Sequence, residues 1–210
     1  MLTEIIPTGE LKMCLEKVKT ARIVVDYIFV GFDESLGATE LHQKAAVFAL
    51  EVLGKRLDTY FASLAKELGK ERKDFFQIIN QSEKAQGSCT DLEHFLGRAF
   101  NSSTQKIVSL WEVSENGKGK SKSGDHNGYA EAFSDPPYGV QLTLEEINIL
   151  FSKINTLAFG GLQEMLEIYE WSNDWSTYFD AGHEWWGSFL WTVRHPTQNM
   201  IVAIGASTTD

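Results

Sequence analysis

The sequence predicts an α+β protein with a mainly helical N-terminal half, followed by a small antiparallel sheet that ends in a C-terminal hairpin. Apolar residues recur at helical spacing up to about residue 105, and short apolar runs separated by turns follow. Of the 210 residues, 43% are hydrophobic and 23% are charged, which is typical of a globular protein with its own core. Because no long linker divides the halves, we expect one domain over residues 1–210, with a helical part at 1–105 and a mixed sheet part at 106–210.

The first apolar stripe runs from Leu11 to Phe32 and has the spacing of one helix. Residues 23–30 are so apolar and β-branched that a strand fits there equally well. The most apolar stretch, from Ala21 to Phe32, is interrupted by Asp26. A membrane span needs roughly 20 apolar residues, so this stretch is predicted to belong to the core.

Three more helices are predicted in the first half. The longest runs from Thr39 to Leu68 and ends at Gly69, and a shorter one covers residues 71–80. Thr90 and Glu93 have the spacing of a capping box and begin a helix that reaches residue 100.

The second half is predicted to mix strands with one helix. Residues 106–113 are expected to form a strand, residues 114–128 a flexible exposed loop, and residues 129–133 a short strand. A second capping box, Thr143 with Glu146, begins a helix that Gly160 and Gly161 end. Residues 165–171 fit a strand better than a helix.

The C-terminal residues predict an antiparallel hairpin made of residues 184–193 and 200–206. Large side chains occupy both faces of its first strand: Trp185, Phe189 and Trp191 lie on one face, and Trp186 and Leu190 lie on the other. A strand with this pattern is covered on both sides.

The cysteine content and the N-terminal residues indicate the cellular compartment in which the protein is expected. The first twelve residues lack the features of a secretory signal. The two cysteines, Cys14 and Cys89, are far apart in the sequence and predict two buried free thiols. We therefore expect a cytoplasmic protein without a membrane segment and without a cofactor.

The negative charge is confined to the end of the chain. Residues 1–123 hold 17 basic and 17 acidic side chains, whereas residues 124–210 hold two basic and twelve acidic ones. Five of the six tryptophans lie between residues 171 and 191. An acidic surface disfavours nucleic acid and anionic lipid, and it attracts cationic partners.

This acidic, aromatic stretch is the first candidate site. Its candidate binding residues are Trp171, Asp174, Trp175, Tyr178, Asp180, His183, Glu184 and Trp186. Carboxylates beside exposed rings suit a protein partner or a sugar, and a pair of carboxylates at the right separation would suit a glycosidase. In the alternative interpretation, the tryptophans are core anchors and the acids cap turns.

The second candidate site is Asp135-Pro136-Pro137-Tyr138, and we expect it to form a rigid turn, since proline fixes φ. The four residues resemble the DPPY motif of amino-methyltransferases that act on DNA bases. The resemblance implies that Asp135 and a proline carbonyl hold the target amino group, while Tyr138 stacks on a flipped base. The FxGxG cofactor loop of that family has no counterpart in this chain.

Two further patterns are incomplete. Gly119-Lys120-Ser121 lacks the first glycine of a phosphate-binding loop and the helix after it. His183-Glu184 begins like a zinc-binding HExxH motif, but Gly187 stands where the second histidine would be. We expect no metal site.

The function that the sequence predicts is an interaction module, similar to an inhibitor or an immunity protein, with an acidic tryptophan-rich face for a basic protein partner. The alternative is a small-molecule or carbohydrate-binding protein, or a hydrolase, that uses the carboxylates between Asp174 and Glu184. The sequence leaves the oligomeric state open.

Overall fold

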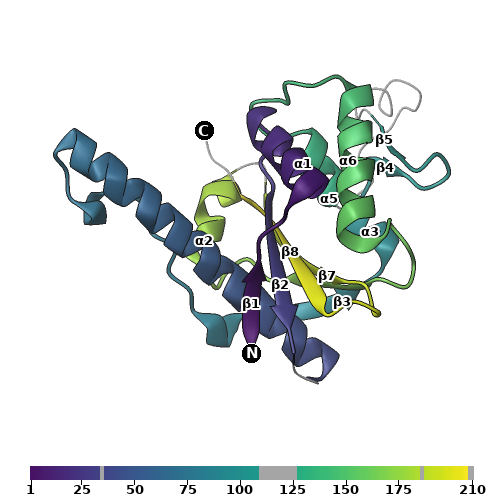
Figure 1. The fold of residues 1–210 in the computed structure, drawn as a ribbon, viewed down its shortest axis with the longest axis horizontal. Coiled ribbons are helices and arrows are strands. Elements are labelled where there is room, and N and C mark those ends of the chain that lie inside the picture. The colour runs from purple at the N-terminus through teal and green to yellow at the C-terminus, as the bar shows by residue number, and fades with distance from the viewer. Residues whose placement is uncertain (34–35, 109–126, 185–186, 208–210) are drawn as a thin grey trace.

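The computed structural model of the chain describes residues 1–33, 36–108, 127–184 and 187–207, and Figure 1 shows its fold. The described residues form a six-stranded antiparallel sheet and a two-stranded ribbon, so the predicted α+β class is confirmed. In spatial order the sheet strands are β1 (Leu2–Ile5), β2 (Asp26–Phe32), β8 (Met200–Ser207), β7 (Ser188–Arg194), β6 (Glu167–Trp171) and β3 (Gly87–Thr90). Three of these strands precede residue 105, so both halves of the chain build the sheet.

Helices cover both faces of the sheet (Figure 1). The helices are α1 (Gly9–Thr20), α2 (Ala38–Leu68), α3 (Leu92–Leu96), α5 (Tyr129–Ser134) and α6 (Leu144–Phe159). One face packs against α1, α3, α5 and α6, and the other packs against α2 and the 3₁₀ segment Thr177–Glu184. Side chains alternate between these two cores along β8: Val202 and Ile204 enter the first core, and Ile201 and Ala203 enter the second.

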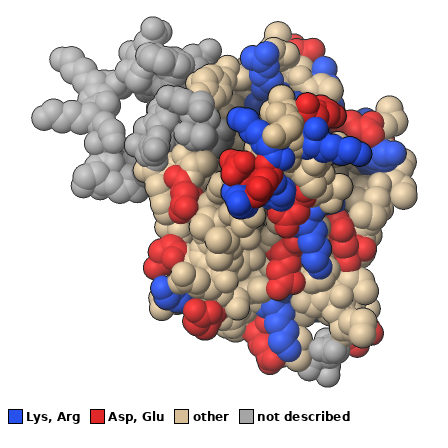
Figure 2. Space-filling view, turned by 90° about the vertical axis from the view of Figure 1, so that its left-hand side faces the viewer, with Lys and Arg blue, Asp and Glu red and all other residues tan. Residues whose placement is uncertain are grey.

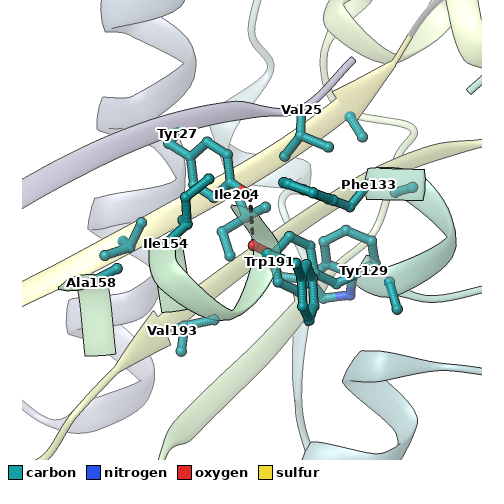
Figure 3. Packing of buried hydrophobic residues seen from close by; sticks show 14 of the residues in the cluster. Val25, Tyr27, Tyr129, Phe133, Ile154, Ala158, Trp191, Val193 and Ile204 are labelled. Atoms are coloured by element: carbon teal, nitrogen blue, oxygen red, sulfur yellow. Dashed lines mark hydrogen bonds between the residues drawn. The ribbon is translucent and has the colours of Figure 1, made fainter. Parts of the chain in front are cut away.

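The first core is rich in aromatic rings (Figure 3). Tyr129 of α5 lies against Phe95 and Phe133, and Trp191 of β7 packs beside it. The hydroxyl groups of Tyr27 and Tyr129 share a hydrogen bond of 2.6 Å inside this core (Figure 3). Each hydroxyl therefore has the partner that a buried polar group requires.

The stripe from Leu11 to Phe32 is not one helix, which corrects the first prediction. Helix α1 ends at Thr20, and the alternative strand forms as β2. The backbone N–H of Arg22 donates to the carbonyl of Lys19, and the N–H of Ile23 donates to that of Val18, the pattern of a Schellman cap. Arg22 has a φ of 61° in the position that glycine usually fills, at a cost of about 1 kcal/mol. No glycine therefore marks this helix end in the sequence.

Helix α2 follows the prediction and ends at Gly69, which adopts a left-handed φ of 64°. Its first half lies on the sheet, and after Leu53 only Ala65 of this helix is buried. The C-terminal half extends beyond the sheet, to the left in Figure 1. The helix predicted over residues 71–80 is wrong: only the 3₁₀ turn Arg72–Asp74 forms there.

The predicted helix that begins near Thr90 is shorter than expected and has another cap. Thr90 ends β3, and the side chain of Asp91 accepts from the backbone N–H of His94 at 2.7 Å to begin α3. A second 3₁₀ turn lies at Ser82–Lys84. The two-stranded ribbon pairs β4 (Phe100–Asn101) with β5 (Lys106–Ile107). The remainder of the strand predicted over residues 106–113, and most of the loop predicted at 114–128, lie outside the described residues.

Residues 129–133 are helical, although a strand was predicted. Helix α5 begins at Tyr129, and the carbonyl of the N-cap residue Gly128 accepts from the N–H of Ala132. In α6 the capping box is confirmed: Thr143 accepts from the N–H of Glu146, and the Glu146 side chain accepts from the N–H of Thr143. Gly160 ends this helix with a φ of 76°, as predicted.

The C-terminal hairpin is confirmed, with β7 and β8 paired from Ser188–Ser207 to Arg194–Ile201. The strand predicted over residues 165–171 is present as β6. Of the two free cysteines, Cys14 is buried as expected, but Cys89 is exposed on the edge strand β3. Every helix that the structure describes is either too short or too polar to cross a bilayer.

A buried histidine lies between α2 and the sheet. The Nδ1 atom of His42 is 2.8 Å from the Thr192 hydroxyl, and its ring stacks on Tyr169 at 4.4 Å between centroids. Its Nε2 atom is 3.8 Å from a Glu167 carboxylate oxygen, which also accepts from Arg194 at 3.1 Å. Burial, and next the positive charge of Arg194, lower the pKa of His42 to about 4.

The first prediction concerns stability against pH. Between the ordinary pKa of 6.5 and about 4, the unfolded chain takes up a proton at His42 that the folded chain does not. The free energy of unfolding should therefore fall by about 3 kcal/mol as pH decreases through this window. Denaturant unfolding at pH 7 and pH 4.5 measures this change in the free energy of unfolding.

His42→Gln should lose this part of the pH dependence, whereas His183→Gln, at an exposed position, should keep it. Equal pH dependence in wild type and His42→Gln would contradict the assignment.

Candidate functional site

The tryptophans of the acidic stretch are core residues wherever the structure describes them. Trp171 is 4% exposed, Trp175 is 1% exposed and Trp191 is fully buried. The indole N–H of Trp171 donates to the Thr192 hydroxyl at 2.9 Å, and that of Trp175 donates to a backbone carbonyl at 2.7 Å. Both rings are used by the second core, so they contribute no exposed face to a partner. Trp185, Trp186 and the side chain of Glu184 lie outside the described residues.

The polar residues of the stretch separate into two places. Asp174, Asp180 and His183 line one pocket of about 330 Å³ beside the 3₁₀ segment, together with the buried Trp175. Tyr178 is buried and points to the other side, toward the first residue of β2. The stretch therefore does not form the single patch that the sequence predicts. Among the described side chains, no group of three or more His, Cys, Asp or Glu is arranged to hold a metal ion.

The Asp135–Tyr138 segment is a turn between α5 and α6. The carbonyl of Pro136 accepts from the N–H of Gly139 at 2.9 Å, and the Pro136 ring is buried. Burial, and next the neighbouring Glu131, raise the pKa of Asp135. Pro137 is half-buried, and Tyr138 is 56% exposed and lies at the edge of a cavity. The predicted turn is therefore confirmed, although a helix rather than a strand precedes it.

That cavity has a volume of about 850 Å³ and lies between α1, the start of β2 and the middle of α2. Leu15 and Val18 of α1 form one apolar wall, and Leu53 and Leu57 of α2 form another. It exists because α2 continues past the sheet, while α1 stands on the opposite face. We name this space the α1/α2 cavity.

A carboxyl group lies on the sheet side of the α1/α2 cavity. Asp26 is the first residue of β2 and is paired with Gly205 of β8. The hydroxyl of Tyr178 donates to Asp26 Oδ2 at 3.0 Å. A Cβ atom on residue 205 would lie 2.6 Å from the Tyr178 oxygen, so only glycine lets the tyrosine ring reach this position.

Asp26 is an exposed residue that lines the α1/α2 cavity, and the Tyr178 hydroxyl contacts its carboxylate from the buried side. Loss of hydration raises the pKa of Asp26, and the hydrogen bond from Tyr178 and the charges of Arg56 and Lys19 offset this only partly. Burial, together with the nearby Asp26, raises the pKa of Tyr178, which therefore stays a neutral donor. Asp26 forms no ion pair with any residue in the described ranges.

Basic side chains dominate the edge of the α1/α2 cavity. Lys12 is 3.8 Å from Glu16, and Arg56 pairs with a glutamate of β1. Lys19 and Arg22 are exposed and form no ion pair with another described side chain. On the face that Figure 2 shows, basic and acidic side chains are interspersed, so the acidic character of the C-terminal sequence does not dominate it.

Asp26, Lys19, Arg22 and Arg56 were not among the site residues predicted from the sequence. One signal was present: Asp26 interrupts the most apolar stretch of the chain, and a lone carboxylate in such a stretch requires an explanation. The basic residues gave no signal, because their part of the sequence carries balanced charge and they meet only through folding.

The second prediction tests whether Asp26 is held at a cost to stability. A carboxyl group whose pKa is raised in the folded state destabilises that state when it is ionised. Asp26→Asn should therefore raise the melting temperature at pH 7, because asparagine still accepts from Tyr178. The gain should disappear as pH falls through the raised pKa toward 3.8.

Melting curves at pH 7 and pH 4 measure the effect, with Asp174→Asn, at an exposed position, as the control. Stabilisation by removal of a charge is typical of a residue kept for function. A lower melting temperature for Asp26→Asn at pH 7 would show instead that the carboxylate stabilises the fold.

Comparison of the chain with protein-family models, with curated proteins and with solved structures finds no match.

Proposed function

We propose that the protein binds a small amphipathic organic molecule in the α1/α2 cavity. The volume of about 850 Å³ lies within the range of small-molecule sites, and apolar side chains form most of its walls. The observation that carries the proposal is the position of Asp26: its carboxylate lines the apolar cavity, accepts from the Tyr178 hydroxyl at 3.0 Å and forms no ion pair with a described cation. An apolar concave site with one perturbed acid is the usual arrangement of a ligand site.

The apolar and the polar side chains of the cavity contribute to ligand binding in different ways. The leucine and valine walls remove apolar ligand surface from water, at about 25 cal/mol for each Å². Asp26 offers an acceptor for an N–H or O–H group of the ligand, and its hydrogen bond from Tyr178 fixes its orientation. A ligand group that pairs with Asp26 restores the interactions lost through desolvation, which gives specificity as well as affinity.

The third prediction uses N-phenyl-1-naphthylamine, a neutral apolar dye whose fluorescence rises in an apolar site. Wild-type protein should bind the dye saturably. Leu57→Glu places a charge on the wall of the α1/α2 cavity and should weaken binding about tenfold or more. Ala62→Glu adds the same charge to an exposed part of the same helix and should leave the affinity unchanged.

Fluorescence titration of the three proteins decides the outcome. Absence of saturable binding to wild type, or equal weakening by both substitutions, would contradict a site between α1 and α2.

A protein partner is the second candidate function, and the Asp174–Asp180 pocket favours it. Both carboxylates are exposed and line one pocket, which suits a basic side chain of a partner. The fourth prediction is that a hexa-arginine peptide binds with an affinity that falls as salt rises, and that Asp174→Asn/Asp180→Asn weakens this binding.

The double variant Glu83→Gln/Glu93→Gln removes the same net charge at exposed positions elsewhere and should have little effect. Calorimetry measures the affinity of each variant for the peptide. Equal weakening by both double variants would show that binding depends only on the net charge of the protein, which would contradict a specific site at this pocket.

A further inference from the structure

Arg22 occupies a backbone position that glycine would fill without strain. It follows the last turn of α1 with a φ of 61°, in the Schellman cap that ends this helix. Strained backbone positions of this kind cluster at functional sites. The side chain of Arg22 is exposed and contributes to the edge of the α1/α2 cavity.

The helix dipole does not explain an arginine at this position. Cations near the C-terminus of a helix are favourable, but Lys17 and Lys19 in the last turn of α1 already satisfy this preference. A glycine at residue 22 would keep the same cap. The arginine side chain therefore needs another reason.

Of the four basic side chains that line the cavity, two form ion pairs with carboxylates and two do not. Lys12 and Arg56 have acidic partners in ion pairs, whereas Lys19 and Arg22 form no ion pair among the described residues, and the charge of Lys19 acts on Asp26 only at longer range. Both free cations belong to the α1 side of the cavity, and Asp26 belongs to the sheet side. An anionic ligand group is attracted to the first side and repelled from the second.

We propose that Lys19 and Arg22 bind the acidic group of the ligand, so that the occupant of the α1/α2 cavity is an organic anion with an apolar body. The inference rests on the proposed small-molecule function and names its ligand class. A guanidinium group binds carboxylate, sulfonate or phosphate oxygens through two parallel hydrogen bonds, which glycine at the same position cannot provide.

The fifth prediction compares two dyes that differ by one anionic group. 8-Anilinonaphthalene-1-sulfonate has the body of N-phenyl-1-naphthylamine with a sulfonate added. The wild-type protein should bind the sulfonate dye more tightly, and rising salt should remove this advantage. Arg22→Gly should weaken binding of the sulfonate dye about tenfold and leave the neutral dye within twofold, and Lys19→Gln should act in the same direction.

The chain offers a matched control for the backbone change. Gln105 is the other described non-glycine residue with a positive φ, 54°, and it lies away from the α1/α2 cavity. Arg22→Gly and Gln105→Gly should both raise the melting temperature, because glycine relieves the same strain. Only Arg22→Gly should change the affinity for the sulfonate dye.

The outcomes separate this inference from the proposed function. In one outcome, the two dyes compete with each other and Leu57→Glu weakens the binding of both, but Arg22→Gly and Lys19→Gln change the affinity for neither dye. The cavity then binds ligands, but the proposed anion site is wrong. If neither dye binds to wild type, the proposed function fails and the anion site fails with it. Selective loss of the sulfonate dye in Arg22→Gly supports both.

Discussion

The structure depends on a sheet whose central strands are packed on both faces. β2, β8 and β7 send alternate side chains into two separate cores, so most residues in the middle of each strand are apolar. This requirement buries Trp191 in one core and places Trp171 and Trp175 in the other. Large aromatic residues that are close in the sequence are therefore distributed through the interior, and the polar residues between them remain outside.

The same packing creates the α1/α2 cavity. Helix α2 is 31 residues long, and its N-terminal half is sufficient to cover its face of the sheet. The rest of α2 continues past the sheet, and α1 approaches it from the opposite face. Asp26 begins β2 at this edge, where the sheet no longer needs an apolar side chain. A carboxyl group at that position is compatible with the fold only because the cavity keeps it in contact with solvent.

Local signals predicted the parts of the fold that local chemistry determines. Gly69, Gly160 and the Thr143–Glu146 capping box mark helix ends through the backbone groups that they satisfy, and the structure confirms each of them. The end of α1 was missed because Arg22 replaces the expected glycine. Residues 129–133 were assigned to a strand because five residues are too few to distinguish the two periods. The candidate site depends on contacts such as Tyr178 with Asp26, 152 residues apart, which no local pattern encodes.

The most direct test of the account is a map of the ligand-induced changes in the amide NMR spectrum of the protein. On titration with N-phenyl-1-naphthylamine, the account predicts shifts in the last turn of α1, at Asp26 and Tyr27, and in residues 53–60 of α2. Shifts concentrated around Asp174 to His183, or spread evenly over the surface, would contradict a binding site between α1 and α2.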